Sequence, residues 1–229
     1  RLAPNLHVAQ LSASAFAMSA RGFNVSNNAS LSNKLLVMID GRSVYSPLFG
    51  GVYWDMQAVL PENIERIEVI SGPGGTLWGS NAVNGVINII TRSAEATQGT
   101  LALLGGGGGE TYATVRHGGK LGESGHFRLY GRGIGRPGMR RANGVATEDE
   151  WNREQVGFRA DWGVPGEGLT LQGDAYQGRS SQISPLASQQ ISGFNLLTRW
   201  SHRLQGDDQL QVQAYIDQTE REVPTASGE

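Results

Sequence analysis

Apolar and polar residues alternate along much of the second part of the chain, which is the pattern of β-strands with two unlike faces. Every second residue from Val156 to Trp162 is apolar, Gln209–Asp217 repeats the alternation, and Phe194–Trp200 shows it more loosely. Weaker segments of the same kind are Thr100–Leu104, Thr111–His117, His126–Ile134 and Leu169–Gln177. The pattern predicts about seven strands in up-and-down order, separated by turns rich in Gly, Asn, Asp and Pro.

Two architectures fit strands with one apolar and one polar face. One is a soluble antiparallel sandwich with a dry core, and the other is a transmembrane barrel with lipid outside and a wet lumen. The segments are close to the length of roughly ten residues that crosses a bilayer as a tilted strand. Trp162 and Trp200 lie near the ends of predicted strands, where membrane barrels carry aromatic girdles. These features favour the barrel.

The first part of the chain has β-favouring runs without this strict alternation. The run from Lys34 ends at Asp40-Gly41, a dipeptide suited to a tight turn because the turn needs positive φ. It predicts a buried strand followed by a hairpin turn. Asn63–Ser71 and Gly85–Arg92 are enriched in β-branched residues and predict two further strands.

Two short helices are predicted among these strands. Tyr53–Leu60 spaces its apolar residues at helical intervals, and Pro61 bars continuation. Thr76 can cap a second helix over Leu77–Val83. Strands and helices together predict a small mixed α/β domain.

Composition narrows the classes of protein further. The 229 residues suffice for one or two domains with a core. The 19 Lys and Arg residues nearly balance 21 Asp and Glu residues, so a net charge of −2 gives no field that would gather nucleic acid. The longest wholly aliphatic run, Leu35–Ile39, has five residues. A membrane-spanning helix needs roughly 20, so none is expected.

The sequence carries no motif of an enzyme or a metal centre. Cysteine is absent, which excludes disulfides, thiolate nucleophiles and Cys-based zinc sites. Gly74 and Gly79 have the spacing of a phosphate-binding loop, but Ser80 stands where that loop needs Lys. The four histidines lie far apart, and no Gly-x-Ser-x-Gly elbow occurs. We expect no enzymatic activity, no cofactor and no resident metal.

Four segments carry motifs in one order over about 75 residues. They are Ser19-Ala-Arg-Gly-Phe23, Leu35-Leu-Val-Met-Ile-Asp-Gly41, Ile64-Glu-Arg-Ile-Glu-Val-Ile-Ser-Gly-Pro73 and Leu77-Trp-Gly-Ser-Asn-Ala-Val-Asn-Gly-Val-Ile-Asn-Ile-Ile-Thr-Arg92. Together they resemble the successive signatures of the plug domain of TonB-dependent outer-membrane receptors.

The resemblance implies the fold class: an α+β plug domain followed by antiparallel transmembrane β-barrel strands, part of an incomplete 22-stranded barrel. We expect the plug at residues 1–96 and the first seven or so barrel strands at residues 97–229. The family's N-terminal energy-coupling box and the first part of its plug are expected before Arg1. The chain is therefore interpreted as a fragment, which alone should neither insert stably nor transport.

The resemblance also implies a function. A barrel wide enough for a large solute would leak, and a plug fills its lumen until the ligand arrives. The expected protein is a ligand-gated, TonB-energised receptor in the bacterial outer membrane, surrounded by outer-membrane lipid. Its expected solute is most often a ferric siderophore, with cobalamin, haem or carbohydrate as other substrates, so that a metal arrives only within the transported chelate. TonB would bind through the segment before Arg1.

By the same resemblance, the ligand-binding candidates lie in two apical loops of the plug. The first loop supplies short polar side chains and the second supplies mostly aromatic ones, a mixture typical of ligand pockets. The candidates are Asn24, Asn27, Asn28, Ser30, Tyr45, Ser46, Phe49, Tyr53 and Trp54. The alternative, open for about half of them, is that the Asn-rich stretch forms turns and the aromatic rings pack beneath it.

Charges on a plug within a polar barrel should find partners on the barrel wall, because half of a buried pair is costly to leave alone. Arg21, Arg66 and Glu68 are the candidates for these plug–barrel contacts. The polar connection Pro137–Glu150 is expected as an extracellular loop. The turns Gly119–Gly125 and Pro165–Gly168 are expected on the periplasmic side.

A second class of function stays open from the sequence. The same elements would suit a soluble interaction module, an α/β domain joined to a β-sheet that binds a protein or a glycan. The complete gene product should be bound to the outer membrane under the first interpretation and freely soluble under the second.

Overall fold

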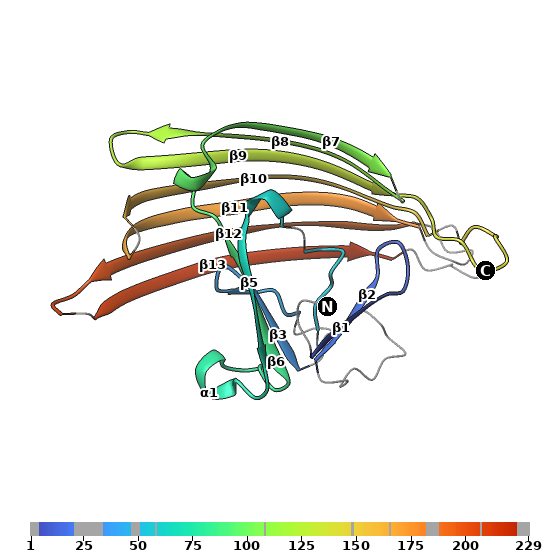
Figure 1. The fold of residues 1–229 in the computed structure, drawn as a ribbon, viewed down its shortest axis with the longest axis horizontal. Helices are drawn as coiled ribbons and strands as arrows, with labels where there is room; N and C mark the ends of the chain where they lie inside the picture. Colours follow the sequence, from blue (N-terminus) through green and yellow to red (C-terminus); the bar gives the residue numbers. More distant parts are fainter. Residues whose placement is uncertain are drawn as a thin grey trace. The chain divides into compact units, whose positions relative to one another are not determined.

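The computed structural model describes residues 5–20, 34–46, 51–57, 59–107, 109–147, 149–164, 166–181, 188–206 and 208–223. The chain divides into two compact units, Arg1–Arg92 and Ser93–Glu229. Figure 1 shows the strands of both, and each unit is described below by itself. Among the described residues, no helix has the length and apolar character needed to cross a membrane.

The main sheet of the first unit has four strands in the order β4-β3-β6-β5 (Figure 1). β3 (Leu35–Ile39) lies parallel to β6 (Gly85–Thr91), while β4 (Arg42–Ser43) and β5 (Ile64–Ser71) run antiparallel to their neighbours. The strands predicted from the run after Lys34 and from the two β-branched segments are therefore confirmed.

A separate antiparallel pair, β1 (Leu6–Gln10) and β2 (Phe16–Ala20), forms a second sheet in this unit. The sequence analysis did not predict it. The two strands are only five residues long and lack a turn dipeptide of the Asp-Gly kind.

The core of the first unit lies on both faces of β3, whose five residues are all buried. Leu35, Val37 and Ile39 belong to a cluster on one face, and Leu36 and Met38 belong to a cluster on the other. A strand covered on both faces has no polar side, which explains why this segment is a continuous apolar run and does not alternate.

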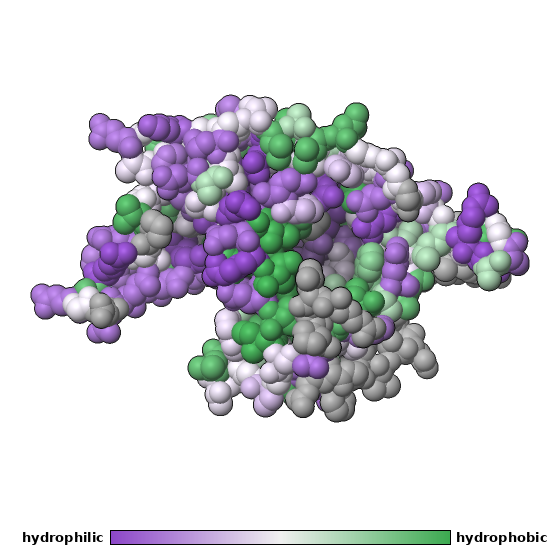
Figure 2. Space-filling model, viewed as in Figure 1, coloured by the Kyte–Doolittle hydropathy of each residue, from purple (hydrophilic) through white to green (hydrophobic). Residues whose placement is uncertain are grey.

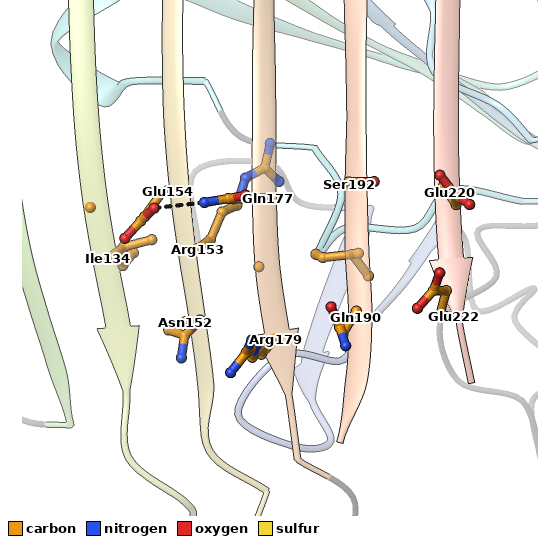
Figure 3. Close-up of a pocket in the computed structure, with 13 residues that line it drawn as sticks. Ile134, Asn152, Arg153, Glu154, Gln177, Arg179, Gln190, Ser192, Glu220 and Glu222 are labelled. Carbon is orange, nitrogen blue, oxygen red and sulfur yellow. Dashed lines mark hydrogen bonds between the residues drawn. The ribbon is translucent and has the colours of Figure 1, made fainter. Parts of the chain in front are cut away.

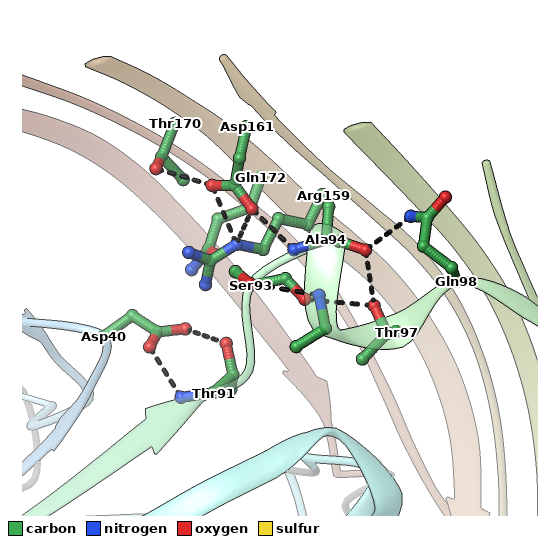
Figure 4. Close-up of polar contacts among 11 residues, drawn as sticks. Asp40, Thr91, Ser93, Ala94, Thr97, Gln98, Arg159, Asp161, Thr170 and Gln172 are labelled. Carbon is green, nitrogen blue, oxygen red and sulfur yellow. Dashed lines mark hydrogen bonds and ion pairs between the residues drawn. The ribbon is translucent and has the colours of Figure 1, made fainter. Parts of the chain in front are cut away.

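The predicted hairpin turn after β3 is confirmed. Asp40 and Gly41 have φ of 50° and 79°, the positive values that such a turn requires. The buried Asp40 carboxylate accepts the backbone N–H of Thr91 at 2.9 Å and its hydroxyl at 2.7 Å. Figure 4 shows how this carboxylate fastens the turn to the last residue of β6.

Both helix predictions need correction. The described part of Tyr53–Leu60 contains only a turn, and Pro61 begins the 3-10 helix η1 (Pro61–Asn63) where it was expected to end a helix. Proline fits the first helical position because its missing N–H would be unsatisfied there anyway.

The second helix, α1 (Gly75–Trp78), starts earlier than predicted and ends after one turn. Its N-cap is Gly74, and no side chain caps it, so Thr76 is not the cap. Gly79 follows with a φ of 83°, a conformation that ends the helix.

The second unit is one antiparallel sheet of seven strands, joined in sequence order from β7 to β13 (Figure 1). A short 3-10 helix, η2 (Glu95–Thr97), precedes it. The strands are β7 (Gly99–Gly107), β8 (Glu110–Leu121), β9 (Gly125–Arg136), β10 (Trp151–Val164), β11 (Glu167–Ser180), β12 (Gln189–Arg203) and β13 (Gln209–Glu222). Each predicted alternating segment lies within one of them, so the up-and-down order is confirmed. Most strands are longer than ten residues and continue beyond the alternating stretch.

The connections at the two ends of this sheet differ in length. At one end, 122–124, 165–166 and 204–208 join consecutive strands. At the other end the connections are 108–109, 137–150 and 181–188, and the longest is held by a bridge between Arg140 and Ala146. Hydrophilic residues gather over the turns at the left of Figure 2.

Candidate functional site

The described ligand-binding candidates lie at the base of one loop in the first unit. Ser46 and Gly51 exchange backbone hydrogen bonds of 2.7 and 3.3 Å, which close the loop between them. Tyr45 and Tyr53 flank this bridge, and both are half-buried. The structure therefore brings Tyr45, Ser46 and Tyr53 to one loop base.

Trp54 has a packing role that the alternative interpretation anticipated. Its ring packs against the cluster that contains Val37 and the fully buried Val52. Its backbone C=O also accepts the N–H of Gln57 at 3.3 Å in a turn. Part of the Trp54 surface thus serves the core of the unit, although the side chain stays half-buried.

The other candidates of the two loops, with one charged candidate, lie outside the described residues. They are Arg21, Asn24, Asn27, Asn28, Ser30 and Phe49.

Arg66 and Glu68 form an ion pair on β5. The Nε of Arg66 lies 2.9 Å from Oε1 of Glu68, and its Nη1 lies 2.7 Å from Oε1 of Glu65. Asn88 of the neighbouring strand donates to Oε2 of Glu68 at 3.0 Å. The hydrogen bond from Arg66 comes first among the causes that lower the pKa of Glu68, followed by the one from Asn88.

The seven-stranded sheet has one strongly basic face, named here the polar face, which carries Arg153, Arg159 and Asp161 of β10. Residues in register across neighbouring strands share a face. Following the register from β10, ten basic residues lie on this face: Arg116, Lys120, Arg128, Arg132, Arg136, Arg153, Arg159, Arg199, Arg203 and Arg221. Its described acidic residues are Glu110, Asp161, Asp174 and Asp217.

Aromatic rings hold several of these guanidinium groups. The Cζ of Arg153 lies 4.0 Å from the ring centroid of Tyr176, and that of Arg136 lies 5.3 Å from Trp151. Arg132 lies 6.0 Å from the Tyr112 ring, and its buried Nε has no hydrogen-bond partner among the described residues. Stacking on a ring holds a cation without neutralising it. Arg136 is also ion-paired, with its Nε 2.7 Å from Oε2 of Glu110. The face keeps a net positive charge because its ten basic residues outnumber its four acidic ones.

Glycine makes room for two of the rings on this face. A Cβ on Gly157 would lie 2.5 Å from the Tyr130 ring, and one on Gly193 would lie 2.6 Å from the Tyr176 hydroxyl. Both distances are shorter than any normal contact, so each ring lies across a neighbouring strand only because the residue there is glycine. These approaches explain part of the high glycine content of the second unit.

The opposite face of the sheet, named the apolar face, carries rows of hydrophobic residues across β10 to β13. Their exposure is high: 62% for Val156, 41% for Leu196 and 56% for Ile216. The rows are Val156, Ala175, Phe194 and Gln218; Phe158, Gly173, Leu196 and Ile216; Ala160, Leu171, Thr198 and Ala214; and Trp162, Leu169, Trp200 and Val212. Figure 2 also shows hydrophobic residues over β7 and β8.

The apolar rows have the length that a bilayer requires. Along β10 they run from Val156 to Val164, nine residues, as many as a tilted strand needs to cross the hydrocarbon at roughly nine to eleven. Contiguous exposed apolar surface of this kind marks a membrane or protein contact.

Two rows of polar side chains lie directly beyond this band on the same face (Figure 3). They line a shallow hollow of about 710 Å³. The rows are Asn152, Arg179, Gln190 and Glu222, then Glu154, Gln177, Ser192 and Glu220. The change from apolar to polar rows marks one edge of the band.

The sequence analysis did not select the basic face as a site. The signal was the alternation itself, because Arg159 and Arg199 occupy polar positions in the alternating segments. The summed charge of seven strands became visible only once the register joined them. In the part of the chain that the structure describes, no group of three or more His, Asp or Glu side chains could hold a metal ion.

Comparison with known proteins points to one family. Residues 1–86 match the family model of the TonB-dependent receptor plug domain. Over 88 residues the chain is 44% identical to the vitamin B12 transporter BtuB of Vibrio vulnificus, covering 38% of this chain and 13% of that protein. It is 29% identical over 205 residues to BtuB of Photobacterium profundum, covering 83% of this chain and 32% of that protein.

Among solved structures, the siderophore receptor PirA from Pseudomonas aeruginosa matches with a TM-score of 0.61 at 21% identity. The match covers 85% of this chain and 34% of that one. The predicted fold class, a plug followed by antiparallel barrel strands, is thereby confirmed. The chain spans about a third or less of the length of each of these proteins. They are transporters and receptors, which agrees with the expectation that the chain is not an enzyme.

Proposed function

Because this chain carries plug and barrel strands of a TonB-dependent outer-membrane receptor, we propose that the complete protein imports a ferric siderophore across the outer membrane. TonB would supply the energy through a segment that precedes Arg1. We take the first unit as plug and the second as barrel wall, with the boundary at Arg92 and Ser93, four residues before the one expected from sequence.

The basic polar face is the observation that carries the choice of solute. In a membrane barrel the apolar face must meet lipid, so the polar face lines the lumen. Ten basic residues against four acidic ones then give the described wall a positive field. Such a field raises the local concentration of anions. Ferric complexes of catecholate or carboxylate chelators are anions, which suits this wall.

The other solutes fit this wall less well. Cobalamin carries little net charge, and an uncharged carbohydrate gains nothing from a positive field. Haem carries two propionates and is therefore the competitor to include in any test. The soluble interaction module is not supported, because Val156, Leu196 and Ile216 leave the apolar face of the sheet exposed.

We also propose how the chain is oriented. Membrane barrels have short periplasmic turns and longer extracellular loops. The connection 137–150 would then be extracellular, and the turns 122–124 and 165–166 would be periplasmic. The polar rows of Figure 3 would lie at the headgroup level on the extracellular side.

The plug loops keep the role expected from the resemblance. Tyr45, Ser46 and Tyr53 converge at one loop base and would meet the solute there, together with the candidates outside the described residues. Trp54 would contribute mainly by supporting that base. Arg66 and Glu68 are proposed to contact the barrel wall as a preformed pair.

The test of the proposed solute removes one charge from each face in the complete receptor. Arg132→Gln neutralises a guanidinium on the polar face, and the matched control Arg179→Gln neutralises one on the apolar face. Binding of ferric catecholate, ferric carboxylate, haem and cobalamin is measured on outer membranes that lack other receptors. Loss of one charge-assisted contact predicts roughly tenfold weaker binding of an anionic ferric chelate by Arg132→Gln and no change by Arg179→Gln.

Binding of cobalamin alone, at equal strength in all three proteins, would contradict the siderophore proposal while leaving the receptor family unaffected. Selective binding of haem would assign the same basic wall to propionate recognition and would also reject the siderophore.

A further inference from the structure

Hydrogen bonds fix the chain on both sides of the boundary between the two units. The junction at this boundary comprises Thr91 and Arg92 of the first unit and Ser93 and Ala94 of the second. Each side contains one carboxylate that binds the backbone of the junction, Asp40 in the first unit and Asp161 in the second (Figure 4).

On the plug side, the chain is fixed up to Arg92. Asp40 receives two hydrogen bonds from Thr91, and its own N–H donates to the C=O of Ile89 at 2.9 Å. The N–H of Arg92 donates to Asn63 at 2.8 Å, and its Nε donates to the C=O of Ile64 at 3.2 Å. The end of β6 is thus tied to both the β3 turn and the start of β5.

On the barrel side, the chain is fixed again from Ser93 onward. The N–H of Ala94, a fully buried residue, donates to Oδ2 of Asp161 at 2.6 Å. The hydroxyl of Ser93 accepts the N–H of Ala96 at 3.2 Å. The C=O of Ala94 accepts from Thr97 and Gln98, at 3.1 and 2.7 Å.

The Asp161 carboxylate is itself held in place. The Nε of Arg159 lies 3.0 and 2.8 Å from its two oxygens, and the Thr170 hydroxyl donates to Oδ1 at 2.7 Å. Arg159 is in turn bonded to Gln172 at 3.2 Å. Because β10 and β11 both contribute, the Ala94 N–H is bound by a rigid acceptor on two barrel strands.

A glycine on the wall allows this approach. A Cβ on Gly118 of β8 would collide with the backbone carbonyl oxygen of Thr97. The 3-10 helix η2 can therefore pack on β8 only because residue 118 has no side chain.

We propose that Asp161 is a positioning residue of the transport cycle, which keeps the C-terminal end of the plug fastened to the barrel wall while the lumen opens. Asp40 fixes the other end of the junction. Three Cα–Cα steps join Thr91 to Ala94, so these residues can never separate by more than about 11 Å. A path for the solute must then form without removing the end of β6, by changes in other parts of the plug.

The test measures local opening of the junction in the complete receptor, so it is independent of which solute is carried. Hydrogen–deuterium exchange is followed by mass spectrometry in peptides that cover residues 93–98. Asp161→Ala removes the acceptor of the Ala94 N–H, and loss of a hydrogen bond to a charged group predicts roughly tenfold or faster exchange there. Asp161→Asn keeps an acceptor oxygen and should give a smaller increase. The matched control is Glu154→Gln, a carboxylate on the same strand but the opposite face, which should leave exchange unchanged.

A second readout separates positioning from general stability. Cells with the Asp161→Ala receptor should admit a large antibiotic more readily at an unchanged melting temperature of the barrel. If Asp161→Ala does not fold, Thr170→Val, which removes one support of the carboxylate, serves the same comparison. Unchanged exchange at residues 93–98 in every folded variant, or an equal rise in Glu154→Gln, would overturn the proposal.

Discussion

The two sheets of this chain face different surroundings. In the four-stranded sheet, β3 is apolar on both faces, and Val37 at its centre has no exposed surface. In the seven-stranded sheet one face is basic and the other exposes Leu196 and Ile216. The first sheet gains its stability from its own core. The second leaves its apolar side chains exposed on one face and pairs charges on the other, as Arg159 and Asp161 do.

This difference explains why the patterns differ along the sequence. A strand with two covered faces needs no polar position, whereas a strand between lipid and water needs one at every second residue. The comparison also predicts which substitutions each sheet tolerates, from the largest effect to the smallest.

The largest effect is expected from a charge in the core of the four-stranded sheet. Val37→Asp would bury an unpaired carboxylate and should destabilise the plug by about 5 kcal/mol. Susceptibility of the plug to protease in the complete receptor measures this. Val37→Ile, a modest change in volume, should stay resistant. Protease resistance of Val37→Asp would mean that β3 is not a core strand.

A charge on the apolar face should have the next largest effect. Leu196→Lys places an ammonium group near the middle of the apolar rows and should cost about 2 to 4 kcal/mol. Urea-dependent unfolding of the receptor in lipid vesicles measures it. The control is Ser192→Lys, on the same strand and face but within the polar rows, where the cost should be close to zero. Equal costs at both positions would argue that this face does not meet hydrocarbon.

A methyl group beside an aromatic ring should have a smaller effect on the polar face. Gly157→Ala would push against the Tyr130 ring and should destabilise the barrel by about 1 to 3 kcal/mol. Gly133→Ala is the matched control on the adjacent strand, since a Cβ there meets nothing within 4 Å. Thermal melting in detergent compares the two. If Gly157→Ala melted at a temperature no lower than that of Gly133→Ala, this result would contradict the close approach of Tyr130 to Gly157.

The smallest effect is expected from acid at the exposed pair on β5. The folded state lowers the pKa of Glu68 from its ordinary value of 4.5, first through the hydrogen bond from Arg66. Its contribution is therefore complete above pH 4.5 and is lost as the pH falls through the lowered pKa. Hydrogen exchange in β5 and β6, corrected for intrinsic rates, should rise across that window. Glu68→Gln should abolish the rise, and a rise that persists in it would assign the effect to another group.

Much of the fold could be predicted from the sequence because its signals are local. The alternation located all seven barrel strands, and Asp40-Gly41 located a turn whose two φ angles are positive. The helix expected at Tyr53–Leu60 was wrong because spacing alone does not distinguish a helix from a buried turn. Pro61 is compatible with the start of a helix as well as with its end.

The site was less predictable because its contacts join distant positions. Asp161 and Ala94 are 67 residues apart in sequence, and Asp40 and Thr91 are 51 apart. No periodicity links such pairs. The basic face likewise depends on the register among seven strands, which a pattern within one strand does not determine. The aromatic candidates at the loop base came from family resemblance, and their ligand contacts stay a prediction.

The position of β7 has a consequence for assembly. Within the described sheet β7 pairs with β8 alone, so its other edge presents unpaired backbone groups. A closed barrel in lipid leaves no strand edge unpaired, so another strand of the complete protein is expected to pair with β7. The 3-10 helix η2 leads directly into β7 and contacts β8 and β9. In a closed barrel of this fold, the closing strand would therefore pair with a strand that begins two residues after η2 ends.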